Sequence, residues 1–94
     1  MSEEVPEDKK PLIEYPTVYT FKVMGVQAEG FADHVKQLFR RLTGNQLADE
    51  SVREQPSSRG KYVSLSVSVY LLSEEQRRSI YVELHRDERV VYYL

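Results

Sequence analysis

In the segment from Lys61 to Leu71, every residue after Lys61 belongs to an uninterrupted alternation between apolar residues and residues that carry hydroxyl groups. The apolar set is Val63, Leu65, Val67, Val69 and Leu71, and the other set is Tyr62, Ser64, Ser66, Ser68 and Tyr70. Because successive side chains of a strand point to opposite faces of a sheet, this period of two predicts a strand. One face of that strand is expected to be buried and the other solvated.

A second strand is predicted from Thr17, where aromatic and β-branched residues alternate with other residues until Gly25 ends the strand. The period then changes, because apolar residues between Glu29 and Thr43 recur at intervals of three or four. This spacing places them on one face of an amphipathic helix. Gly44 follows a basic last turn, which is typical of the residue after a helix.

A second helix is predicted after Ser73. Ser73 and Gln76 have the spacing of a capping box, in which the side chain of each residue bonds to the backbone amide of the other. A short edge strand is expected at Asp49–Gln55 and a final strand at Arg89–Leu94. The resulting order, β-α-β-β-α-β, is the split βαβ arrangement. It predicts an α+β, ferredoxin-like fold with a four-stranded antiparallel sheet in the order 4-1-3-2 and two helices on one face.

The length of 94 residues fits one domain. Residues 1–11 are charged and contain two prolines, so we expect a disordered tail there and a single domain at 12–94. The sequence contains no cysteine, which excludes thiol chemistry. It has no apolar run of the roughly 20 residues that a membrane span requires, and its N-terminus is acidic where a signal peptide is basic. We therefore expect a cytoplasmic protein without a membrane association.

The sequence carries no motif for catalysis or metal binding. Its two histidines, His34 and His85, lie far apart in the sequence and form no cluster with metal-ligand spacing. The serines of the alternating strand have no neighbouring base and no nucleophile-elbow motif around them. The expectation is therefore a protein that is not an enzyme and needs no metal or cofactor.

Nucleic-acid binding is also disfavoured, although RNA-recognition domains share the predicted topology. The net charge of −2 arises in residues 1–11, and the rest of the chain carries equal numbers of acids and bases. RNA-recognition domains place base-stacking aromatic residues on their third strand. Lys61, Val63 and Ser66 stand at those positions here.

Two loops are candidates for a ligand site. The first contains Pro56, Ser57, Ser58, Arg59 and Gly60, with Tyr62 close behind. Hydroxyl groups, a guanidinium and backbone amides in a tight loop can hold an anion, although the same residues also suit an ordinary hairpin turn. The second candidate is the first strand–helix junction, where Gly25 permits a tight turn and helix amides point outward.

The segments PTVYTFKVMG (16–25) and PSSRGKYVSLSVSV (56–69) resemble a small bacterial family typified by YbeD. The resemblance spans residues 11–94. It implies a ferredoxin-like fold similar to ACT-type regulatory domains, which bind small effectors near the first strand–helix loop, usually at a dimer interface. It supplies no catalytic residue, and it adds weight to the segment Pro56–Tyr62.

We therefore expect a non-enzymatic regulatory or adaptor domain that forms a homodimer and binds a small anionic effector in an ACT-like manner. The alternative is a protein-interaction module that uses the serine-lined sheet face or the apolar strand Arg89–Leu94, whose open edge invites strand pairing. RNA binding is the third and least favoured hypothesis.

Overall fold

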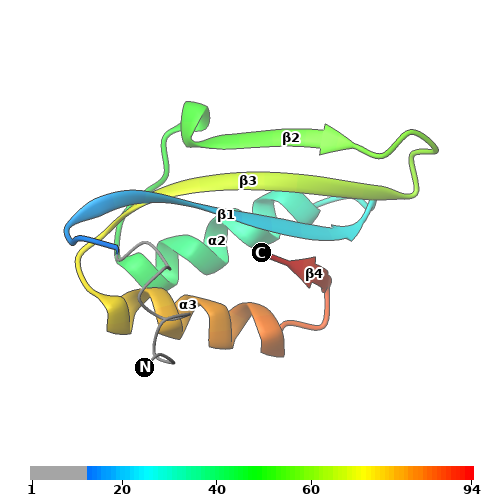
Figure 1. Ribbon diagram of the computed structural model, residues 1–94. Helices are drawn as coiled ribbons and strands as arrows, with labels where there is room; N and C mark the ends of the chain where they lie inside the picture. The colour runs from blue at the N-terminus through cyan, green and yellow to red at the C-terminus, as the bar shows by residue number, and fades with distance from the viewer. Residues whose placement is uncertain (1–12) are drawn as a thin grey trace, which may run out of the picture.

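The computed structural model describes residues 13–94, which form a four-stranded antiparallel sheet with two helices on one side (Figure 1). The elements are β1 (Thr17–Val26), α2 (Phe31–Thr43), the 3-10 turn η1 (Asp49–Ser51), β2 (Val52–Pro56), β3 (Tyr62–Leu71), α3 (Glu74–Arg86) and β4 (Val90–Tyr93). The strands lie in the order β2-β3-β1-β4, which is the predicted order read from the opposite edge. The α+β, ferredoxin-like prediction is confirmed, whereas the predicted tail at 1–11 lies outside the described residues.

The two central strands pair along their whole length. Ten pairs run from Thr17 opposite Leu71 to Val26 opposite Tyr62. On β3 the valines and leucines of the alternating pattern are buried, while the serines are half-buried on the other side. The alternation in the sequence therefore corresponds to the two faces of the sheet. Within the described part of the chain, neither helix is long and apolar enough to cross a membrane.

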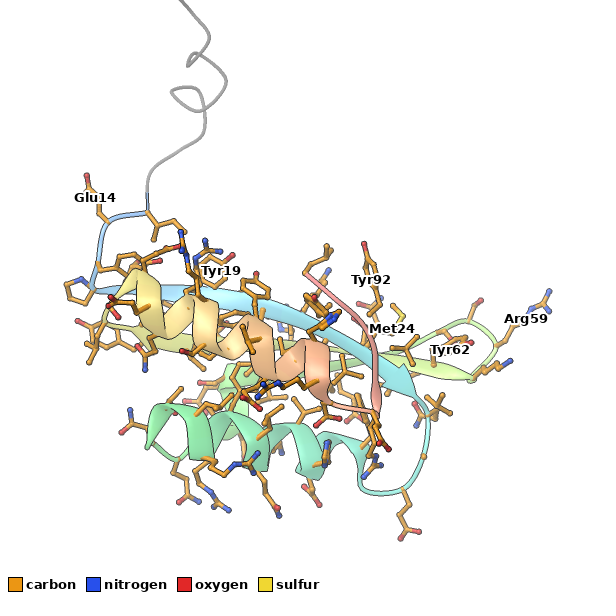
Figure 2. The ribbon with its side chains drawn as sticks, turned by 90° about the horizontal axis from the view of Figure 1, so that it is seen from below. Glu14, Tyr19, Met24, Arg59, Tyr62 and Tyr92 are labelled. Atoms are coloured by element: carbon orange, nitrogen blue, oxygen red, sulfur yellow. The ribbon has the colours of Figure 1, made fainter. Side chains whose placement is uncertain are left out.

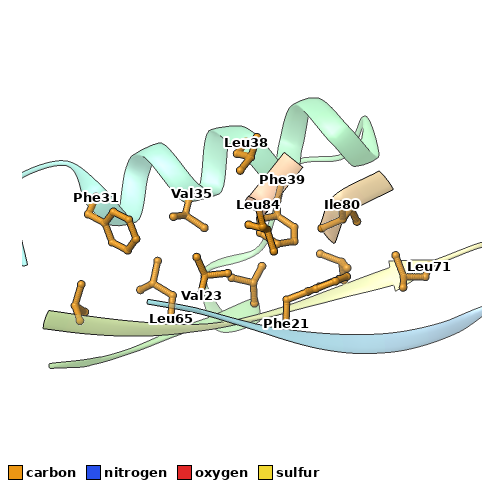
Figure 3. Close-up of a cluster of buried hydrophobic side chains, with 13 residues drawn as sticks. Phe21, Val23, Phe31, Val35, Leu38, Phe39, Leu65, Leu71, Ile80 and Leu84 are labelled. Atoms are coloured by element: carbon orange, nitrogen blue, oxygen red, sulfur yellow. The ribbon is translucent and has the colours of Figure 1, made fainter. Parts of the chain in front are cut away.

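The core lies between the sheet and the helices (Figure 3). Its buried side chains come from β1, β3 and both helices: Phe21, Val23, Phe31, Val35, Leu38, Phe39, Val63, Leu65, Val67, Val69, Leu71, Ile80 and Leu84. Full burial of one such large side chain contributes about 1.5–3 kcal/mol relative to exposure. The three buried phenylalanines, at 21, 31 and 39, are the largest of these groups.

Two local details differ from the sequence-based expectation. The segment Asp49–Ser51 forms a 3-10 turn, because the Ser51 amide donates to the carbonyl of Ala48, and β2 begins only after it. At the start of α3 the Ser73 hydroxyl accepts a hydrogen bond from the Gln76 amide, as predicted. The Gln76 side chain, however, accepts from the amide of Leu72 instead of Ser73, so the cap includes one residue more than a simple capping box.

Gly25 lies inside β1 and does not end it. It pairs with Val63 on one side and Val90 on the other, and its φ angle is not positive. A Cβ atom at this position would overlap the ring of Phe31 and would lie 2.7 Å from the carbonyl oxygen of Arg89. A glycine is needed here because α2 packs its first aromatic ring against the strand, and the tight turn that leads into α2 falls at Gly30, where φ is 83°.

Candidate functional site

The face of the sheet opposite the helices carries no other element of the described chain (Figure 1). We call this surface the open face. The strand pairing assigns to it Val18, Thr20, Lys22, Met24 and Val26 of β1, Arg53 and Gln55 of β2, the serines and tyrosines of β3, Tyr92 of β4, and Leu94. Five of these side chains are large apolar groups that stay exposed: Val18, Val26, Tyr70, Tyr92 and Leu94.

The register arranges the charged residues of the open face in one row across the strands. Lys22 lies opposite Ser66, and Ser66 lies opposite Arg53. On its other side Lys22 exchanges two backbone hydrogen bonds with Leu94, of 3.0 and 2.9 Å. A lysine and an arginine therefore flank a serine hydroxyl in the middle of the open face.

The next two rows toward the hairpin contain the apolar and aromatic side chains. Met24 lies opposite Ser64 on one side and Tyr92 on the other, and Val26 lies opposite Tyr62. Figure 2 shows Met24, Tyr62 and Tyr92 projecting from the same side of the sheet. We call Met24, Val26, Tyr62 and Tyr92 the hairpin patch, because they lie at the end of the sheet where β2 and β3 are joined. A shallow recess of about 250 Å³ lies there, lined by Met24, Gln55, Pro56, Ser57, Tyr62, Val63 and Ser64.

The loop between β2 and β3 uses several of its polar groups internally. The amide of Ser57 donates to the carbonyl of Tyr62, and the amide of Gly60 donates to the carbonyl of Ser57. The Ser57 hydroxyl accepts from the amide of Tyr62 at 3.2 Å. Gly60 has a φ angle of 73°, and Arg59 extends from the tip of the loop (Figure 2). These contacts make the loop a stable hairpin, and they leave fewer amides for an anion than its sequence suggests.

The structure brings the two predicted loops to the same end of the sheet, where the amide of Gln27 donates to the carbonyl of Lys61. Pro56, Ser57 and Tyr62 line one recess, while Ser58, Arg59 and Gly60 lie exposed beyond it. Gly25 is separated from them because it faces the core. Whether any of these residues binds a ligand stays a prediction.

A second recess, of about 290 Å³, lies on the open face beside the start of β2. It is lined by Thr20, Glu50, Ser51, Arg53, Ser66 and Ser68. The hydroxyls of Thr20 and Ser68 are hydrogen-bonded to each other at 2.8 Å. Thr20 and Ser68 are therefore each bonded to a hydroxyl and not to a carboxylate or a histidine.

The flank of α3 carries a polar cluster that the sequence interpretation missed. Glu74 accepts hydrogen bonds from Arg77 at 2.7 Å and from the hydroxyl of Tyr15 at 2.6 Å. Arg77 also reaches the hydroxyl of Tyr19, which lies 3.0 Å from the hydroxyl of Tyr81. We call these five residues the α3 network. Of these five residues, the sequence of α3 contains only Glu74, Arg77 and Tyr81, because Tyr19 comes from β1 and Tyr15 from the segment before it.

The electrostatics of the α3 network favour the ordinary charge states of its members. The Arg77 guanidinium and the Tyr15 hydroxyl hold the pKa of Glu74 down to about 2. Hydrogen bonding to Glu74 raises the pKa of Arg77. Burial, together with the Tyr19 hydroxyl, raises the pKa of Tyr81 to about 12. Near neutral pH the network therefore consists of a carboxylate, a guanidinium and neutral phenols. These charge states suit a structural role, in which the hydrogen bonds join α3 to β1 and the segment before it.

The histidines lie at separate places. Nε2 of His34 is 2.7 Å from a carboxylate oxygen of Asp87, which connects α2 to the turn after α3. Nδ1 of His85 is 3.1 Å from the hydroxyl of Tyr93. In the described part of the chain no three histidine, cysteine or acidic side chains gather where they could hold a metal ion.

Comparison with known proteins identifies relatives over nearly the whole chain. Residues 10–94 match the family described as "Protein of unknown function (DUF493)". A UPF0250 protein from Leptothrix cholodnii is 33% identical over 82 residues, which make up 87% of this chain and 88% of the relative. UPF0250 protein IL0958 from Idiomarina loihiensis is 36% identical over 83 residues, or 88% of this chain and 91% of the relative. These matches confirm the family resemblance indicated by the two sequence segments.

A solved structure shows the same fold. The solution structure of protein HP0495 from H. pylori superimposes with a TM-score of 0.74 at 22% sequence identity. The superposition covers 94% of this chain and 91% of that chain.

Proposed function

The chain belongs to the DUF493 family, and we propose that it is a non-enzymatic adaptor or regulatory domain that binds another protein on its open face. The observation that carries this proposal is the hairpin patch at one end of that uncovered surface. Tyr92 is 55% exposed and Val26 48%, and Met24 and Tyr62 stand next to them through the strand register. Exposed or half-buried tyrosine, methionine and aliphatic side chains on the surface of a sheet are the groups that protein interfaces bury.

The shape of the open face supports a protein partner more than a small molecule. Sites for small ligands are concave and commonly enclose roughly 300–1,000 Å³. The two recesses of the open face are smaller, at about 250 and 290 Å³, and both are shallow. The hairpin loop also spends the amides of Ser57, Gly60 and Tyr62 on its own hydrogen bonds. A flat surface with an apolar patch at one end is better suited to another folded chain.

The test is affinity capture from a lysate of the bacterium that encodes the protein, with three immobilised forms. These are the wild type, the double variant Tyr62→Ser/Tyr92→Ser, and the control Val82→Ser, which changes an exposed apolar residue of α3. We expect the wild type and the control to retain one protein in stoichiometric amount, and the double variant to retain about ten-fold less.

Equal retention by the double variant would overturn the proposal. A small molecule released from the wild type, with no protein partner, would instead support the effector hypothesis. Circular dichroism of all three forms would establish that the substitutions leave the fold intact.

A further inference from the structure

We infer that the partner presents carboxylates to the open face. This inference rests on the proposed function and adds the chemistry of the partner. Every charged residue that the strand register places on the open face is basic, namely Lys22 and Arg53. Arg59 and Lys61 add two more bases at the adjoining hairpin. Glu50 of η1 lies at the rim beside Arg53, and no acid occupies an open-face position on the described strands.

In residues 13–94, charged side chains form ion pairs on the helix side of the sheet, whereas the two bases on the strands of the open face form none. Within residues 13–94, every ion pair lies on the helix side, where Glu74 pairs with Arg77 and Arg78 and Glu83 pairs with Arg86. The pair of His34 with Asp87 also lies there. Lys22 and Arg53 are exposed and belong to none of these pairs. No acid of the described chain therefore forms an ion pair with Lys22 or Arg53.

The arrangement of these bases suits carboxylates. Lys22 and Arg53 stand two strands apart, and the strand spacing places their backbones about 10 Å from each other. Ser66 lies between them and can donate a hydrogen bond to the same partner surface. A guanidinium binds a carboxylate through two parallel hydrogen bonds, while an ammonium acts as a compact positive charge. The hairpin patch, which lies next to this row, would bury an apolar part of the same partner.

A second copy of this chain is a poor occupant of the open face. Face-to-face packing would place Lys22 and Arg53 of each copy against a surface on which every charged residue assigned by the strand register is basic. Like charges facing each other across an interface oppose association. The charge pattern therefore favours a different protein, one whose contact surface is acidic beside an apolar patch.

A single-stranded nucleic acid also carries negative charge, but the open face offers it few stacking platforms. Proteins that bind single strands stack successive bases on aromatic side chains. Ser64, Ser66 and Ser68 occupy the middle of β3, and the tyrosines stand only at its two ends, at 62 and 70. The pattern therefore favours carboxylates over phosphates.

The experiment titrates the 15N-labelled protein with two 12-residue peptides, one of alternating Glu and Ser and one of alternating Lys and Ser. Three forms are compared: the wild type, Lys22→Glu/Arg53→Glu, and Lys36→Glu/Arg41→Glu. The last pair changes the charge of α2 by the same amount. Equal unfolding temperatures of the three forms would confirm that each is folded.

We expect the Glu peptide to shift the amide signals of Lys22, Arg53 and Ser66 in the wild type and in the α2 variant. Its apparent Kd should be about ten-fold higher for the open-face variant and should rise with salt. No shift on the open face, or an equal response to the Lys peptide, would overturn the inference. Tighter binding of a 12-nucleotide oligouridylate at the same signals would overturn it in favour of a nucleic-acid site.

The capture experiment distinguishes a failure of this inference from a failure of the proposed function. If a protein is lost from the tyrosine variant but retained by Lys22→Glu/Arg53→Glu, the proposed function stands and the acidic partner is wrong. If the tyrosine variant retains everything, the proposed function fails, whatever the peptides show.

Discussion

The two faces of β1 differ in how strongly the fold constrains the residues on them. On the helix side Phe21 and Val23 are fully buried, while on the open side Lys22 is exposed and Met24 is half-buried. These residues alternate along one strand, so the backbone geometry is the same for both sets. Packing against the helices fixes the inner set. The open face does not have to be apolar for the fold to form, and its exposed apolar groups therefore point to a role in binding.

The tyrosines of the two sides differ in the same way. On the helix side the hydroxyls of Tyr19 and Tyr81 lie 3.0 Å apart, and the guanidinium of Arg77 lies over both rings. On the open side the hydroxyls of Tyr62 and Tyr92 form no hydrogen bond with any residue in the described range. One pair of rings connects elements of the fold, and the other pair is available to a partner.

The largest difference in stability between variants of the two faces is expected for substitutions at two neighbouring residues, Gly25 and Met24. Gly25→Ala would force a methyl group against the ring of Phe31 and the carbonyl of Arg89, and we expect a loss of about 1–3 kcal/mol in unfolding free energy. Met24→Ala removes a half-buried side chain from the open face, and its cost should stay below about 1 kcal/mol. Urea unfolding of both variants gives the comparison. Equal losses would show that the inner side of β1 is no more constrained than the outer side.

The sequence predicts the fold well because the fold follows from local patterns. Alternation predicts β1 and β3, the spacing of apolar residues predicts α2, and the Ser73 cap predicts the start of α3. The strand order then follows from general rules of connection. Each of these signals lies within about a dozen neighbouring residues.

The site depends on contacts that no local pattern records. The need for glycine at position 25 comes from Phe31 and Arg89, which meet it only after α2 and β4 have packed. The hairpin patch exists because Met24 and Tyr92 pair across different strands. The row of bases likewise needs the register of three strands. Sequence reasoning therefore found the hairpin end of the sheet and Tyr62, but not the pairing that places Met24 and Tyr92 beside it.

A smaller effect is expected when one hydroxyl is removed from each side. Tyr81→Phe loses the hydrogen bond to Tyr19 in a half-buried position, and we expect a loss of about 1 kcal/mol. Tyr92→Phe removes an exposed hydroxyl, and its effect should lie within about 0.5 kcal/mol of zero. Thermal unfolding followed by circular dichroism measures both. A larger loss for Tyr92→Phe would mean that the open face contributes to the fold itself.

The smallest effect is the loss of stability at acid pH. It should arise on the helix side, because the open-face positions of the strands carry no carboxylate. The folded state lowers the pKa of Glu74 from its ordinary 4.5 to about 2 through Arg77 and Tyr15. The stabilisation from this carboxylate is therefore complete above about pH 4.5 and is lost as the pH falls through 2. Glu74→Gln should remove that part of the acid-induced loss of stability, whereas Glu75→Gln, an exposed neighbour in the same turn, should keep it. Urea unfolding between pH 2 and pH 7 measures the slopes, and identical slopes for the two variants would show that the α3 network does not control the acid response.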